Sequence, residues 1–248
     1  GEKAGIIVPG VPVIYDGNDK DAAEVIAAKA KELGSPAYKV IQAGAKVLGN
    51  NKDGIDFSLE DDYYGDTRFH IPFIAWYQVM NASLALTTME VLKDRIPVTM
   101  EQLQAGIANT RWQGRMETIL PGVIVDGAHN EDGVRRFVET AERFQKEYPL
   151  TLLFSAVNDK DYQDMIHTIC SRIKFRKVVT TEVGGYREVP SAELAEIFCK
   201  EGCKDVGNSD NIEEAFHMAH EAKGEAGMLF CVGSLYLVGE IKTLLLKK

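Results

Sequence analysis

The stretch that decides the fold is Val123-Ile-Val-Asp-Gly-Ala-His-Asn130. Its first three residues form a short apolar run, which is typical of a buried strand that ends at Asp126. Gly127-Ala128 then turn the chain, and Asn130 suits the N-cap position of the amphipathic segment that follows. A carboxylate, a histidine and the free N–H groups of a helix start therefore meet at the carboxyl end of a strand. In open α/β sheets, ligands bind at this edge.

The pattern beyond this stretch is regular, with short links between apolar strands and amphipathic helices. The predicted strands are 150–154, 177–181, 205–206 and 227–232, and the predicted helices are 131–148, 162–173, 192–200, 212–223 and 235–246. This alternation predicts an α/β fold in which a Rossmann-like, mostly parallel sheet is covered on both faces. No Gly-x-Gly-x-x-Gly fingerprint is present, which disfavours a dinucleotide cofactor.

Polar residues follow other predicted strands as well. Ser155–Asp161 follows the second strand of this half, and Gly233-Ser234 follows the last, so a hydroxyl lies at a helix N-terminus. Such a position is a natural anion site, although a serine there can equally be a plain N-cap. Arg115, upstream, could close on an anion at the same edge. An Asp-Gly turn alone is more often only a turn.

Residues 1–109 have a different character and predict a first domain. A strand–helix–strand unit is expected over 11–41, with Ala22, Val25, Ile26 and Ala30 along one side of its helix. Short, partly alternating runs at 46–49, 54–58 and 67–70 predict a small antiparallel sheet. Helices are predicted over 73–92 and 99–108. The residues 109–111 are the best candidate for a linker to the second domain, 110–248.

Two features of the first domain stand out at helix positions. Thr99 and Gln102 have the spacing of a capping box. Asn81 lies inside an apolar helix, where a buried amide must find a partner. It is therefore expected to tie helices together or to reach a ligand, and spacing alone favours the structural role.

Composition excludes several classes of protein. The chain has 248 residues and a net charge of -9, without a long Lys/Arg block, which argues against binding nucleic acid or an anionic membrane. No signal peptide and no apolar run long enough to span a membrane is present. The four cysteines do not have the spacing of a zinc site, and reduced, mostly buried thiols of a cytoplasmic protein are expected.

Separated motifs resemble one family along the whole chain, in order and at plausible spacing. They are Gly1-Glu-Lys-Ala-Gly-Ile-Ile7, Tyr77-Gln-Val-Met-Asn-Ala82, Gly114-Arg115, Asp126-Gly-Ala-His-Asn130, Asp159-Lys-Asp161 and Gly233-Ser-Leu-Tyr236. Each is weak alone, but together they resemble the folylpolyglutamate synthase and dihydrofolate synthase family of the Mur ligase superfamily.

The resemblance implies an ATP-dependent ligase that adds L-glutamate to the γ-carboxylate of a folate or tetrahydrofolate. The carboxylate would take the γ-phosphoryl group of ATP, and the glutamate amine would attack the resulting acyl phosphate. ATP and Mg²⁺ are the implied cofactors, folate (poly)glutamates and L-glutamate the partners, and a monomer is expected. Dihydrofolate synthase activity stays open.

The resemblance also assigns roles in the first domain. Lys3 is implied to be a carbamylated lysine, which would be a catalytic residue and a metal ligand through hard oxygen atoms. Asn81 is implied to contact ATP.

In the second domain, Arg115 is implied to bind the ATP phosphates, where a planar guanidinium suits oxyanions, and to act in catalysis. Asp126 would accept hydrogen bonds from the ribose hydroxyls. His129 and Ser234 are expected near the phosphates and the incoming glutamate, with His129 also a catalytic candidate.

The sequence departs from the family in one respect. The phosphate-binding loop of the type Gly-x-x-Gly-Lys-Ser is absent, as are the upstream Glu and His that would hold magnesium. The expectation is a C-terminal fragment, with 1–109 the end of a P-loop ATPase domain and 110–248 a complete C-terminal domain, inactive by itself. Two alternatives stay open: a non-catalytic nucleotide-binding domain, and a Mur ligase acting on a cell-wall precursor.

Overall fold

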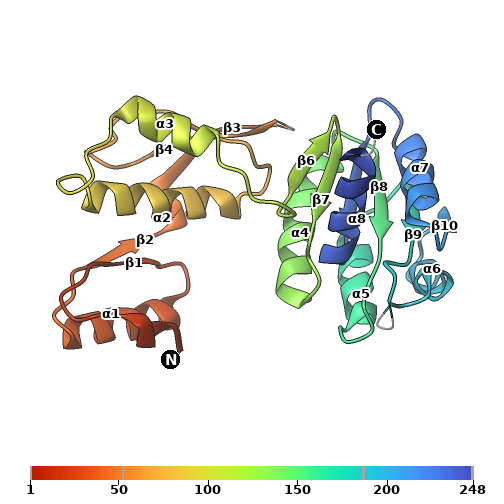
Figure 1. Cartoon of the computed structure of the whole chain (residues 1–248), viewed down its shortest axis with the longest axis horizontal. Helices are drawn as coiled ribbons and strands as arrows, with labels where there is room; N and C mark the ends of the chain where they lie inside the picture. Colours follow the sequence, from red (N-terminus) through yellow and green to blue (C-terminus); the bar gives the residue numbers. More distant parts are fainter. Residues whose placement is uncertain (1, 52, 186–187, 247–248) are drawn as a thin grey trace. The chain divides into compact units, whose positions relative to one another are not determined.

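The computed structural model describes residues 2–51, 53–185 and 188–246, and the chain divides into two compact units (Figure 1). The first unit is Gly1–Arg111 and the second is Trp112–Lys248. Among the described helices, none combines the length and the apolar character that crossing a membrane requires.

The first unit opens with a strand–helix–strand arrangement, as predicted. Its elements are η1 (Glu2–Ile6), β1 (Val13–Asp16), α1 (Lys20–Glu32) and β2 (Ala37–Val40). The two strands pair in parallel, and Asp19 caps α1 by accepting the N–H of Ala22. The predicted inner face of α1 is partly wrong, because Ala23 and Ala30 are the buried residues and Val25 is exposed. A helix that packs on only two strands buries a narrow stripe, and small alanines allow the close approach.

The predicted antiparallel sheet and the two helices are also present. They are η2 (Gln42–Gly44), β3 (Ala45–Asn51), β4 (Gly54–Leu59), β5 (Phe69–Ile71), α2 (Tyr77–Val91) and α3 (Met100–Ala108). β4 lies between β3 and β5, and its apolar side chains pack with those of α2 and α3. Helix α2 begins four residues later than predicted, because the buried segment before it is not helical. The capping box of Thr99 and Gln102 is confirmed.

The second unit is built on a six-stranded sheet in the order β10-β9-β8-β11-β7-β6. Its strands are β6 (Glu117–Leu120), β7 (Val123–Asp126), β8 (Leu150–Phe154), β9 (Lys177–Thr180), β10 (Val206–Asn208) and β11 (Met228–Val232). All neighbours pair in parallel except β6, an antiparallel edge strand that was not predicted. Strand β11, the last in the chain, lies between β7 and β8, and all three are buried throughout. The mostly parallel α/β fold is confirmed.

Helices cover both faces of this sheet. They are α4 (Glu131–Phe144), α5 (Tyr162–Arg172), α6 (Ser191–Lys200), α7 (Ile212–Lys223) and α8 (Leu235–Leu246). On one face Phe137 of α4 packs on Phe230, and Phe198 of α6 packs on Phe154. On the other face, apolar residues of α7 and α8 pack on β7, β8, β9 and β11. The sheet is therefore a buried middle layer (Figure 1).

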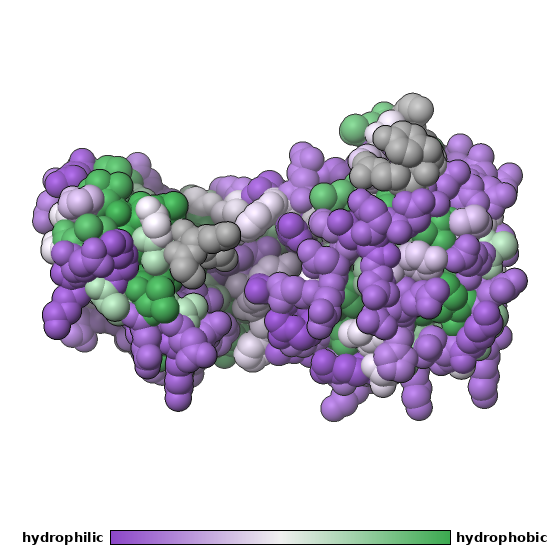
Figure 2. Space-filling view, turned by 90° about the horizontal axis from the view of Figure 1, so that it is seen from below, coloured by the Kyte–Doolittle hydropathy of each residue, from purple (hydrophilic) through white to green (hydrophobic). Residues whose placement is uncertain are grey.

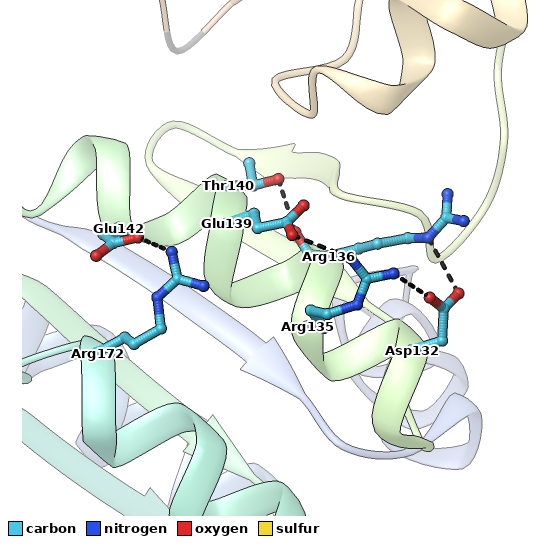
Figure 3. Close-up of polar contacts among 7 residues, drawn as sticks. All are labelled: Asp132, Arg135, Arg136, Glu139, Thr140, Glu142 and Arg172. Atoms are coloured by element: carbon cyan, nitrogen blue, oxygen red, sulfur yellow. Dashed lines mark hydrogen bonds and ion pairs between the residues drawn. The ribbon is translucent and has the colours of Figure 1, made fainter. Parts of the chain in front are cut away.

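The outer surface of α4 carries a network of charges (Figure 3). Asp132 accepts hydrogen bonds from Arg135 and Arg136, while Glu142 pairs with Arg172 and so links α4 to α5. These groups are largely exposed, and exposed ion pairs contribute only about 0–1 kcal/mol each. The apolar face of α4, rather than this network, fixes the helix on the sheet.

Candidate functional site

The Asp126 side chain lies at the carboxyl end of β7, almost out of contact with solvent. Its exposed fraction is 4%, and each carboxylate oxygen accepts a backbone N–H at 2.8 Å, Oδ2 from Met116 and Oδ1 from Ala128. Burial raises the pKa of Asp126 to about 6, against the smaller lowering effects of these N–H groups and of the Arg115 and His129 charges. Arg115 and His129 are the chain neighbours of Met116 and Ala128, whose N–H groups bond the carboxylate.

Arg115 is held on a rigid loop. The N–H of Gly114 donates to Oε2 of Glu117, and the N–H of Gly127 donates to the carbonyl of Gly114, both at 2.8 Å. Gly114 has φ +66°, and Met116, at φ +48°, is the one non-glycine residue of the described chain with a positive φ. Such a conformation is uncommon for a side chain as long as methionine and persists where surrounding contacts impose it. The bond to Asp126 supplies that constraint, so the half-buried Arg115 starts from a fixed backbone.

The loop is also tied to the last helix. Glu117, which accepts the Gly114 N–H, pairs with Nζ of Lys242 on α8 at 2.8 Å. The ideal Cβ position of Gly114 lies 3.3 Å from a methyl group of Val238, also on α8. The loop therefore packs directly against α8.

His129 is oriented by the backbone. Its Nδ1 lies 2.7 Å from the carbonyl oxygen of Gly127, and because a carbonyl only accepts, Nδ1 carries the hydrogen. In the neutral ring, Nε2 is then the acceptor. A half-buried imidazole with a fixed tautomer can accept a proton or a hydrogen bond at Nε2.

Ser234 lies two residues beyond the end of β11, the strand next to β7, where Val232 pairs with Asp126. The Ser234 hydroxyl is buried and accepts the N–H of Tyr236 at 3.1 Å, so the N-cap interpretation is borne out geometrically. Gly233 has φ +110°, and a Cβ there would lie 2.1 Å from the carbonyl oxygen of Ser155. Only glycine allows this close approach of the ends of β11 and β8.

Ser155, at the end of β8, was not singled out as a site residue by the sequence. Its side chain is completely buried, and its Oγ is one of three such side-chain atoms in the described chain that have no hydrogen-bond partner. Buried polar groups normally have partners, so an unpaired hydroxyl beside Gly233 leaves hydrogen-bonding capacity at this edge.

The connections of neighbouring strands diverge at the same place. The chain leaves β7 toward α4 on one face of the sheet and leaves β11 toward α8 on the other. Ligands of open α/β sheets bind where neighbouring strands lead to opposite faces. The structure thus brings together Arg115, Asp126, His129 and Ser234, four of the predicted residues, at one edge of the second unit.

Asn81 belongs to the first unit and is exposed on α2, so the expectation of a buried amide is wrong. Helix α2 is apolar almost all round, and periodicity could not tell which side faces solvent. Nδ2 of Asn81 donates to Oε1 of Gln78 at 2.7 Å. Gln78 is buried, and its Nε2 has no partner. Sequence reasoning missed this pair, although two amides three residues apart on one apolar helix were the available signal.

Lys3 cannot be placed as a site residue. Its backbone belongs to η1, but its side chain lies outside the part that the structure describes. Within the described part of the chain, no three His, Cys, Asp or Glu residues form a group that could hold a metal ion. The role of Lys3 therefore stays a prediction.

Comparison with known proteins gives a consistent result. Residues 114–235 match the family described as Mur ligase, glutamate ligase domain. The dihydrofolate synthase/folylpolyglutamate synthase of Bacillus subtilis is 30% identical over 255 residues that cover 98% of this chain. The chain belongs to the folylpolyglutamate synthase/dihydrofolate synthase family. The folylpolyglutamate synthase of Lacticaseibacillus casei is 28% identical, and the chain spans 56% of the length of each of these two relatives.

Solved structures of this family have the same fold. The folylpolyglutamate synthase of Thermotoga maritima superposes with a TM-score of 0.79 at 25% identity, covering 99% of this chain and 56% of that one. Two more distant structures show the fold alone. Escherichia coli FolC, in complex with DHPP and ADP, has a TM-score of 0.76 at 19% identity, covering 99% of this chain and 56% of that one. The Yersinia pestis enzyme, complexed with AMPPNP and a Mn ion, has 0.72 at 20%, covering 98% and 55%.

Proposed function

We propose that this chain acts in the ATP-dependent addition of L-glutamate to the γ-carboxylate of a folate or tetrahydrofolate, through an acyl phosphate. The observation that carries the proposal is the Arg115 loop, which Asp126 holds in a strained conformation at the edge where Ser234 begins α8. One relative is named dihydrofolate synthase/folylpolyglutamate synthase and another folylpolyglutamate synthase. These names support the choice of a folate as the substrate.

The residues of the second unit suit an anionic ligand such as the ATP phosphates. Arg115 presents a planar fork of hydrogen-bond donors, which matches an oxyanion. The Ser234 hydroxyl and the first N–H groups of α8 add donors at a helix N-terminus. The unpaired Ser155 Oγ beside Gly233 is a further donor at the same edge. Fixed donors of this kind stabilise charge that develops during phosphoryl transfer.

Asp126 and His129 have different proposed tasks. Asp126 uses one lone pair of each oxygen on the Met116 and Ala128 N–H groups, and the remaining lone pairs would accept the ribose hydroxyls. His129 offers Nε2 to the phosphates or to the incoming glutamate, where it could hold a proton of the attacking amine. In the first unit, Asn81 would contact ATP.

Magnesium is part of the proposal only through Lys3. A carbamylated lysine would provide oxygen ligands, and the ion would neutralise phosphate charge. The described residues alone do not form a metal-binding group, so no step is assigned to the ion here.

We also propose that residues 1–109 belong to a P-loop ATPase domain. Support comes from β1 and β2, which form a sheet of only two parallel strands, an arrangement that is marginal on its own. Apolar side chains are exposed nearby: Ile6 at 81%, Val8 at 56% and Val11 at 50%. Figure 2 shows green patches, which mark hydrophobic residues, on the first unit at the left of the view.

The test is a ligation assay with the full-length product of the gene. Protein, ATP, Mg²⁺ and radiolabelled L-glutamate are incubated with tetrahydrofolate, dihydropteroate or a nucleotide-linked cell-wall precursor. Glutamate incorporation and ADP release with a folate or with dihydropteroate support the proposal. Incorporation only with the cell-wall precursor, or nucleotide binding without turnover, contradicts it. The 248-residue polypeptide, which has no Gly-x-x-Gly-Lys-Ser sequence, is expected not to catalyse the reaction by itself.

A further inference from the structure

Two cysteines from different helices lie side by side in the second unit. Cys170 is on α5, Cys203 follows α6, and their sulfur atoms are 3.6 Å apart. The prediction of mostly buried thiols is wrong, since Cys170 and Cys203 are partly exposed and Cys199 is exposed, whereas only Cys231 is buried.

The backbone fixes the position of Cys203. Gly202, at φ +93°, ends α6 in a left-handed turn, and its N–H donates to the carbonyl of Cys199. The N–H of Cys203 donates to the carbonyl of Phe198 at 3.0 Å. These two bonds make a Schellman motif, which folds the chain back over the last turn of the helix. Cys203 is thus presented to α5 by the helix end itself.

The two thiols have unequal acidity. The hydrogen bond with Cys170 lowers the pKa of Cys203, whereas the hydrogen bond with Cys203, followed by burial, raises the pKa of Cys170. Thiolates are the reactive form of cysteine in exchange with disulfides. These directions favour Cys203 as the attacking sulfur and Cys170 as the resolving one.

We propose that Cys170 and Cys203 form a thiol–disulfide exchange site that accepts a low-molecular-weight disulfide and becomes an intramolecular disulfide. The Cys203 thiolate attacks one sulfur of the small disulfide, whose S–S bond breaks and releases one thiolate. Cys170 loses its proton to solvent and attacks Sγ of Cys203, and the second small thiolate leaves. Two protein thiols lose two electrons in total, and the small disulfide is reduced to two thiols. The sulfur atoms must approach by about 1.5 Å from their present 3.6 Å.

The position of the pair determines what the disulfide would do. α5 and α6 begin at the carboxyl ends of the strands, where Ser155 lies, and run toward the amino ends of the strands. The two sulfur atoms lie at the far, C-terminal ends of these helices. The bond would join the ends of two helices on one face of the sheet, away from Arg115 and Ser234. It is expected to stabilise the second unit without changing the candidate site.

The test uses the purified, reduced chain and oxidised glutathione, followed by rapid alkylation of free thiols. Of the four thiols, two are expected to disappear, with the loss of two hydrogen atoms in mass and a peptide cross-link between Cys170 and Cys203. The Tm is expected to rise by roughly 5 °C or more and to return on addition of dithiothreitol. Retention of four thiols, or a cross-link that involves Cys199, overturns the proposal.

Single substitutions separate the steps. Cys170→Ser is expected to stop at the mixed disulfide, with one glutathione attached to Cys203, and Cys203→Ser is expected to form no cross-link. Cys199→Ser is the matched control, because it removes an exposed thiol four residues away and should leave the cross-link intact. If Cys199→Ser abolished the cross-link, the assignment of the pair would be wrong.

Discussion

The carboxylate of Asp126 accepts the N–H of Met116 at 2.8 Å, although the two residues lie on different segments of the candidate site. Met116 has a left-handed backbone conformation, and Asp126 is buried at the end of a central strand. One hydrogen bond thus connects the buried central sheet of the second unit to the loop that carries Arg115.

Replacement of Asp126 by Asn should destabilise the second unit. The amide has one acceptor oxygen, so the N–H of Met116 or of Ala128 is left without its partner, at a cost of about 1–3 kcal/mol. Urea denaturation at pH 7 measures the change. Asp62→Asn, at an exposed position, is the matched control and should stay within about 0.5 kcal/mol of the wild type. Equal stability of both variants would show that the Asp126 bonds do not hold the loop.

The wild type and Asp126→Asn also test the raised pKa of Asp126. Because burial raises this pKa from 3.8 to about 6, the folded state binds the proton more tightly than the unfolded state. The stabilisation that the protonated Asp126 side chain gives to the folded state is therefore complete below pH 4, and it is lost as the pH rises through 6. The stability advantage of the wild type over Asp126→Asn, which cannot titrate, should shrink by up to about 3 kcal/mol between pH 4 and pH 7. A difference that is flat with pH, or that grows, contradicts the raised pKa.

Gly233→Ala should unfold the second unit or weaken it severely. The new Cβ would lie 2.1 Å from a backbone carbonyl oxygen, at φ +110°, and the loss should be at least about 3 kcal/mol. Gly239→Ala is the control on α8, where no atom lies within 4 Å of the new methyl group. This second change should be neutral or should stabilise the protein by up to about 1 kcal/mol. The denaturation midpoint should fall sharply for Gly233→Ala and should stay the same or rise for Gly239→Ala.

Arg115→Ala should reduce turnover far more than stability. The side chain is only half buried, so its removal should cost less than about 1 kcal/mol of folding free energy. If Arg115 binds phosphate oxygens in the transition state, kcat/KM of the full-length protein for ATP should fall by about 100-fold or more. Arg136→Ala, which removes an exposed arginine of α4, is the comparison. A sharply lower Tm with normal turnover would make Arg115 a structural residue.

Gln78→Met should weaken the recognition of ATP and leave the stability of the first unit nearly unchanged. The substitution removes a buried amide whose Nε2 is unpaired, so stability should change by less than about 1 kcal/mol. Asn81 would lose the acceptor that orients it, and KM for ATP should rise several-fold with a smaller change in kcat. The double variant with Asn81→Ala should be no worse than Asn81→Ala alone. Fully additive effects would show that Gln78 does not act through Asn81.

The regular part of the fold could be predicted because local patterns and tertiary structure agree there. The run Val123-Ile-Val125 is buried on both sides, as a central parallel strand requires, and the helix that follows begins at the predicted cap, Asn130. Strand β6 was missed because an edge strand has one exposed side and its pairing is antiparallel, so its residues lack a continuous apolar run.

Only some residues of the candidate site could be named from the sequence, and Ser155 and Gln78 were missed. Arg115 and Asp126 could be named from sequence, yet the left-handed Met116 that joins them depends on a tertiary hydrogen bond. Likewise, the pairing of Cys170 with Cys203 spans 33 positions, and no periodic pattern reports it. Contacts of this kind arise only when the sheet is assembled.

The place of β11 in the sheet has a consequence for synthesis of the protein. Of the six strands of this sheet, β11 is translated last, yet it separates β7 from β8 and pairs with both. While residues 228–232 are still inside the ribosome, β8 of the emerging chain can pair with β9. The strand that should lie between β8 and β7 is still missing. The second unit should therefore complete its sheet only after residues 228–232 have left the ribosome, and until then its central apolar strands are the surface that a chaperone would cover.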